Sequence, residues 1–112
     1  MPIPQAHRAI VRRAKLHDYL LSPDHPGGRS KAAYFRRLGY ERSRWRSLEA
    51  DLREQHLSLE PARVIDTEFG RKYVIEAMLV GPSGGTAMLV SVWIIRSGEE
   101  VPRLVSAYPG RA

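Results

Sequence analysis

The sequence has 112 residues, 43% of them hydrophobic, which suits one domain with its own core and excludes a disordered chain. It contains no cysteine, so disulfides and thiolate metal sites are excluded and a reducing cytoplasm is permitted. The formal net charge is +6, and residues 1–58 hold the whole excess, with twelve Lys/Arg against six Asp/Glu. A basic surface attracts polyanions, of which RNA is the partner we expect; an anionic membrane or an acidic protein fits the charge equally well.

The start of the chain predicts an arm, a helix and a tight turn. Residues 1–11 contain two prolines and no strong period, so we expect an extended arm without a signal peptide. Residues 11–21 place their apolar side chains on one stripe of a helix, which Pro23 ends because the residue before a proline avoids the helical region. Residues 26–28, Pro-Gly-Gly, form a turn whose glycines can adopt positive φ.

Two further helices complete a predicted helical half at residues 12–58. Ser30 is a suitable N-cap for the second helix, and Gly39 is a suitable C-cap. Ser43 is expected to cap the third helix, which ends near His56.

After residue 61 the pattern becomes that of strands, and residues 62–109 form a predicted sheet half. Apolar runs bounded by Gly, Pro and Ser clusters predict strands at residues 62–67, 72–80, 86–95 and 101–108. The third run is apolar on both faces, as expected of a central strand covered on each side, and it is too short to cross a bilayer. We therefore predict an α+β fold with residues 1–112 as a single domain, in which about three helices pack on a four-stranded antiparallel meander.

No metal or cofactor site is predicted. The four histidines, His7, His17, His25 and His56, are scattered and form no HExxH or paired ligand arrangement. The chain also lacks a Walker loop, a GxGxxG motif after a strand and a GxSxG elbow. Any chemistry is therefore expected to come from polar side chains alone.

A polar cluster marks the start of the second predicted helix. His25, Arg29, Ser30 and Lys31 surround a helix N-terminus, whose unpaired N–H groups and partial positive charge favour an anion, above all a phosphate. An ordinary turn followed by solvated surface charges explains the same residues. The residues assigned to substrate binding are Arg29, Ser30, Arg36, Arg37 and Arg103.

RNA cleavage without a metal needs a base for the ribose 2′-OH, a cation for the phosphate charge and an acid for the leaving 5′-oxygen. His25 can be base or acid, because histidine titrates near neutral pH, and Lys31 can hold the phosphate. Ser106 and Tyr108 alternate by two on the last strand, so they share one face and can reach a common ligand. We predict these four residues as catalytic; bracing of the turn by His25 and simple packing of the Tyr108 ring are the alternatives.

Several short motifs resemble an uncharacterised family of small bacterial domains. They are Lys15-Leu16, Tyr19-Leu20-Leu21, His25-Pro26, Gly28-Arg29-Ser30-Lys31-Ala32, Tyr34-Phe35, Leu38-Gly39-Tyr40, Trp45, Val92-Trp93 and Pro102-Arg103-Leu104-Val105-Ser106-Ala107-Tyr108-Pro109. The resemblance covers most of residues 14–109 and implies a family without an activity.

The chain more loosely resembles the superfamily of metal-independent ribonuclease toxins that includes barnase, the EndoU nucleases, the colicin ribonucleases and the RelE toxins. Residues 72–82 and 104–109 are similar to the hairpin and last strand with which many members end, with Ser106 in place of the usual threonine. The resemblance implies helices before a four-stranded antiparallel sheet. It also implies a site that includes His25, Lys31, Ser106 and Tyr108.

We therefore predict a cytoplasmic, metal-independent RNA-cleaving domain of the toxin type that acts by general acid–base transesterification. Its expected protein partner is a small acidic antitoxin or immunity protein. The alternative is a non-catalytic module, namely an antitoxin, an immunity protein or an RNA-binding domain, with the basic half as its contact surface. A nuclease fold that only binds RNA is a third possibility. The sequence indicates no oligomeric state.

Overall fold

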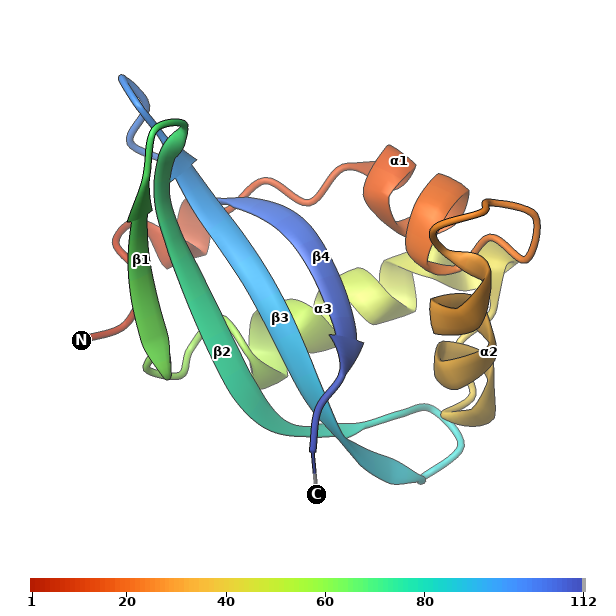
Figure 1. The fold of residues 1–112 in the computed structure, drawn as a ribbon. Coiled ribbons are helices and arrows are strands. Elements are labelled where there is room, and N and C mark those ends of the chain that lie inside the picture. Colours follow the sequence, from red (N-terminus) through yellow and green to blue (C-terminus); the bar gives the residue numbers. More distant parts are fainter. Residues whose placement is uncertain (112) are drawn as a thin grey trace.

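The computed structural model describes residues 1–111, in which the helices precede the strands (Figure 1). The helical part contains η1 (Ala6–Arg8), α1 (Arg13–Lys15), η2 (Leu16–Leu20), α2 (Arg29–Arg37), η3 (Arg42–Arg44) and α3 (Trp45–Gln55), of which η1 and η3 are 3-10 turns and η2 is a π-helical segment. The strands are β1 (Arg63–Thr67), β2 (Gly70–Val80), β3 (Thr86–Arg96) and β4 (Arg103–Pro109). The predicted α+β class is confirmed.

The sheet is a meander in the order β1-β2-β3-β4, with every neighbouring pair antiparallel. α3 lies along one face of the sheet, and α1 and α2 lie beyond the edge strand β4 (Figure 1). We call the other face, which carries Val92 of β3 and Ser106 of β4, the open face. No helix of residues 1–111 covers it (Figure 1).

The core lies between α3 and the sheet. Leu48 and Leu52 of α3 are fully buried, as are Ile75 of β2 and Leu89 and Trp93 of β3. The buried residues of β2 and β3 alternate along their strands, so one face of each of these two strands meets the helices. Each such aliphatic side chain contributes about 1.5–3 kcal/mol through burial.

β3 is the central strand that the sequence predicts, since it pairs with both β2 and β4. α3 covers one face of β3, and no helix of the described residues covers the other, although Val90 and Ile94 are buried there. On the open face Ile94 is still only 9% exposed, because its cross-strand partners Lys72 and Arg103 flank it with long aliphatic stems.

A buried hydrogen-bond chain joins the end of α3 to the sheet. Trp93 Nε1 donates to Ser91 Oγ at 2.9 Å, and Ser91 Oγ lies 2.8 Å from His56 Nδ1. His56 Nε2 lies 3.3 Å from the carbonyl oxygen of Ala77. Every group is satisfied when Ser91 donates to Nδ1 and a neutral His56 donates from Nε2. Burial lowers the pKa of His56, which favours this neutral ring.

The predicted cap of α2 is wrong. α2 begins at Arg29 with Gly28 as its N-cap, so Ser30 lies in the first turn, where it is exposed. The N–H groups of Gly28 and Arg29 both donate to the carbonyl oxygen of His25, at 3.0 and 2.9 Å. The preceding turn thus accepts the N–H of the first helical residue without a serine cap.

The other helix ends agree better with the sequence. Gly39 has a φ of +98° directly after α2, as expected of a glycine that ends a helix. α3 ends with His56 at its C-cap, as predicted. Its predicted start at Ser43 is wrong, because Ser43 lies in η3 and no side chain caps α3.

Residues 1–11, predicted as an extended arm, are held against the fold. Ile3 and Ala9 are buried, and Ile10 forms a parallel bridge with Arg103 that lengthens the edge of the sheet beyond β4. The single helix predicted at residues 11–21 is instead one α-helical turn followed by the wider π-helical segment. Within residues 1–111, no helix is long and apolar enough to span a membrane.

Candidate active site

His25 lies in a tightly bonded turn before α2. Its carbonyl oxygen accepts the two backbone bonds described above, and its ring Nδ1 accepts the N–H of Gly27 at 2.9 Å. Since Nδ1 accepts, the neutral ring carries its proton on Nε2. His25 therefore braces the turn, as the alternative interpretation of the sequence held, and keeps Nε2 available as a donor.

Tyr19 of η2 is the centre of a cationic cluster. Its ring meets the ring of His25 edge to face, with the centroids 4.9 Å apart. Lys31 Nζ lies 5.3 Å and Lys15 Nζ 5.8 Å from the centroid of the Tyr19 ring, within the range of cation–π attraction. Lys31 Nζ also donates to the carbonyl of Gly27 at 3.1 Å, so it is tied to the same turn.

Ser106 of β4 lies across a hollow of about 590 Å³ from these residues. It pairs with Val92 and therefore faces the open side of the sheet, next to a β-bulge. The hollow is lined by Ala14, Lys15, Asp18, Tyr19, His25, Val105 and Ser106. The structure thus brings His25 and Ser106 to one hollow, and Lys31 joins them through its contact with Tyr19.

The surroundings of Tyr19 stabilise its ionised form. Its pKa lies below the ordinary value of 10.0, first because of the hydroxyl of Ser106 and then because of the ammonium groups of Lys31 and Lys15; partial burial opposes them. Asp18 adds a negative charge to the hollow, since the hydrogen bond from His17 lowers the pKa of its carboxyl. A phenol with a lowered pKa is ionised to a larger extent near neutral pH, and its phenolate is the form that can accept a proton.

Gly28 makes this arrangement possible. A Cβ atom at position 28 would lie 2.0 Å from the carbonyl oxygen of Tyr19, which is closer than any side chain can approach. The turn and η2 are therefore in direct backbone contact, and only glycine permits that approach.

The remaining predicted residues lie elsewhere. Arg29, Ser30, Arg36 and Arg37 are exposed along α2. Arg103 is bound by both oxygens of Glu99, at 3.1 and 3.3 Å. Tyr108 shares the open face with Ser106, as its alternation predicts, but lines a separate hollow with residues that include Arg63, Glu76 and Met88.

Tyr19 and Lys15 are the site residues that the sequence reasoning missed. They are four positions apart, a spacing that puts two side chains on one face of a helix, and both occur in the quoted family motifs. That spacing next to a polar turn was the available signal. No pattern of neighbouring residues in the sequence indicated that Lys15 and Tyr19 lie close to Ser106.

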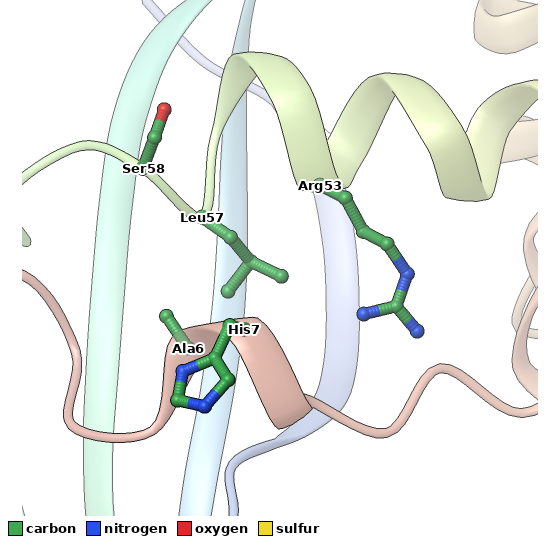
Figure 2. Close-up of a pocket in the computed structure, with 5 residues that line it drawn as sticks. All are labelled: Ala6, His7, Arg53, Leu57 and Ser58. Carbon is green, nitrogen blue, oxygen red and sulfur yellow. The ribbon is translucent and has the colours of Figure 1, made fainter.

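A further hollow of about 290 Å³ lies between η1 and the end of α3 (Figure 2). It is lined by Ala6, His7, Arg53, Leu57 and Ser58. Arg53 is held by Glu49 at 2.9 Å, so its charge is compensated. None of the predicted site residues lies there. In residues 1–111 no three His, Asp or Glu side chains gather as a metal site would require.

The fold is similar to that of a solved chain from a contact-dependent growth inhibition toxin–immunity protein complex of Klebsiella pneumoniae 342. The TM-score is 0.68 at 17% sequence identity, and the match covers 90% of this chain and 99% of that chain. At this identity the likeness shows the fold alone. A comparison with curated proteins gives no match. A family model described as a domain of unknown function, DUF6883, matches residues 2–111, and the chain belongs to that family.

Proposed function

We propose that this domain cleaves RNA in the cytoplasm without a metal ion, as the toxin of a toxin–immunity or toxin–antitoxin pair. The observation that carries the proposal is the meeting of Tyr19, His25 and Ser106 at one hollow, with Lys31 in contact with the ring of Tyr19. The set contains a proton acceptor, a proton donor and cations, which are the groups that metal-free phosphodiester cleavage requires.

Tyr19 is the base in this scheme. Its phenolate takes the proton of the ribose 2′-OH, and the freed 2′-oxygen attacks phosphorus. Ser106 donates to the phenolate before the reaction, and Lys31 stabilises the charge that builds on the phosphate. The same interactions of Ser106 and Lys31 with Tyr19 lower its pKa.

His25 is the acid. In the imidazolium form Nδ1 also carries a proton and releases the N–H of Gly27, and Nε2 gives its proton to the 5′-oxygen as the P–O5′ bond breaks; the neutral ring that remains accepts the Gly27 N–H again at Nδ1. The products are a 2′,3′-cyclic phosphate and a 5′-hydroxyl. This scheme does not use Tyr108, whose predicted catalytic role stays a prediction.

The test is incubation of total RNA with the protein in EDTA. Tyr19→Phe, His25→Ala and Lys31→Ala should each lower the cleavage rate by about 10²-fold or more, and the wild-type fragments should end in a cyclic phosphate. His7→Ala and Arg46→Ala are matched controls, because His7 lines the other hollow and Arg46 is exposed on α3. Absence of cleavage, or equal losses in the controls, would reject the proposal.

A second candidate is a non-catalytic partner such as an immunity protein. It is favoured by the similar structure, which is a complex that holds a toxin and an immunity protein. The two candidates differ when the protein is expressed in cells. Growth inhibition that Tyr19→Phe relieves supports the toxin, whereas protection from a cognate toxin supports the partner.

A further inference from the structure

A second hollow of about 280 Å³ adjoins the candidate active site on the open face. Lys15 and Val105 line both hollows, so the two lie side by side. The side chains that matter here are five cations and one aromatic ring, Arg12, Lys15, Lys72, Arg96, Arg103 and Phe69. The cations come from the segment before α1, from the three strands β2, β3 and β4, and from α1 itself.

The charge of this hollow is largely uncompensated. Glu99 binds Arg103, at 3.1 Å. Among residues 1–111, the other four cations form no ion pair. Five positive charges against one negative charge leave an excess of four, which a chain of phosphates would neutralise.

Phe69 is held at the rim of the hollow by a rigid turn between β1 and β2. The Phe69 N–H donates to Thr67 Oγ1 at 3.2 Å, and Thr67 Oγ1 donates to the carbonyl of Gly70 at 2.7 Å. The carbonyl oxygen of Phe69 accepts the N–H of Ser97 at 3.0 Å. The ring is nevertheless 70% exposed, so a large apolar face is presented to solvent on a fixed backbone.

We propose that this hollow is the binding track of single-stranded RNA, with phosphates along the cations and an unpaired base stacked on Phe69. Fixed cations beside an exposed ring are the combination that binds single strands, because every base has a face that can stack. A duplex offers no such face, since its bases already stack on one another. The inference rests on the proposed function, because the track leads the same strand to Tyr19.

The experiment measures binding separately from cleavage. A fluorescent oligonucleotide of about eight 2′-O-methyl nucleotides cannot be cleaved, because it lacks the attacking hydroxyl, and its anisotropy reports affinity. Phe69→Ala should weaken binding about tenfold, and only for the single strand, not for a duplex of the same sequence. Lys72→Gln and Arg96→Gln should each weaken both and reduce the salt dependence by about 0.7 in the log–log slope.

Val80→Ala and Arg46→Gln are the matched controls, because Val80 is an exposed apolar side chain at the far end of β2 and Arg46 is an exposed cation on α3. Thermal melting checks that each variant is folded. Equal losses in the controls, or an equal effect of Phe69→Ala on the duplex, would overturn the track. If the track variants lose binding while wild type cleaves no RNA, the proposed function fails and the track stands. If wild type cleaves RNA but Phe69→Ala binds the single strand as tightly as wild type, the track fails and the proposed function stands.

Discussion

Among single residues, Tyr19 bears most directly on the proposed reaction, because its phenol must be ionised to accept a proton. The cleavage rate should therefore rise with pH up to the lowered pKa of Tyr19. Ser106→Ala removes the hydroxyl that contributes most to this lowering, so the pKa rises and the ascending limb should move to higher pH. A pH–rate profile of both proteins in EDTA measures the displacement. An unchanged pH–rate profile in Ser106→Ala would show that Ser106 does not lower the pKa of the catalytic base.

Two neighbouring glycines have different tolerance for a side chain. Gly28→Ala places a Cβ atom 2.0 Å from the backbone of Tyr19 and should cost about 2 kcal/mol or more of unfolding free energy. Gly27→Ala meets only side-chain atoms, at 3.4 Å, and should stay within about 1 kcal/mol of wild type. Urea denaturation of both variants measures the difference. Equal stability of the two would show that the turn can move away from η2.

At the scale of elements, the hydrogen-bond chain through His56 ties α3 to the sheet and makes stability depend on pH. Burial lowers the pKa of His56 in the folded state below the ordinary histidine value of 6.5. Between the two pKa values the unfolded chain binds a proton that the folded chain does not, so stability is full above about pH 6.5 and falls as pH drops.

The expected loss is up to about 1.4 kcal/mol per pH unit in that window. Urea unfolding at several pH values from about 7.5 down to 5 measures it. His7→Ala is the control, since His7 is exposed and should leave the slope as it is. His56→Gln should lower stability at neutral pH and flatten the slope. If the same pH dependence of stability persists in His56→Gln, groups other than His56 cause it.

For the whole molecule, the charge pattern determines which partner can cover the site. The basic hollow and the Tyr19 hollow adjoin on the open face, so one acidic protein can block both. We expect a small acidic partner to restore growth to cells that express the domain, and its affinity to fall steeply with salt. Calorimetric titration at two salt concentrations measures this. Restoration of growth by a basic partner, or an affinity of the partner that does not change with salt, would contradict this prediction.

Much of the architecture follows from local patterns. Apolar runs bounded by Gly, Pro and Ser clusters predict all four strands to within a few residues, because both signals lie within each segment. Trp93 is in the core for the same reason. Membership in a family of unknown function, expected from short motifs, is confirmed by the family match. The caps predicted at Ser30 and Ser43 are wrong, because α2 begins at Arg29 after the His25 turn and α3 begins after the 3-10 turn η3.

The candidate site could be predicted only in part. The polar turn was visible as a sequence of His, Gly, Arg, Ser and Lys, and alternation placed Ser106 and Tyr108 on one face. The count of charges placed the whole positive excess in residues 1–58. In the structure, however, Lys72, Arg96 and Arg103 of the sheet half line the basic hollow beside Arg12 and Lys15. A count along the chain cannot show which side chains the sheet register brings together.

The sequence by itself determined the order of helices and strands, the alternation of β2 and the presence of a cationic turn before α2, because these depend on neighbours a few residues apart. The tertiary structure alone decided that Tyr19 lies between that turn and Ser106. It also decided that the basic hollow continues from this point toward Phe69. The physical reason is that tertiary packing brings η2 and β4 to the same hollow, so residues that lie far apart in the chain meet there, and no local periodicity encodes that meeting.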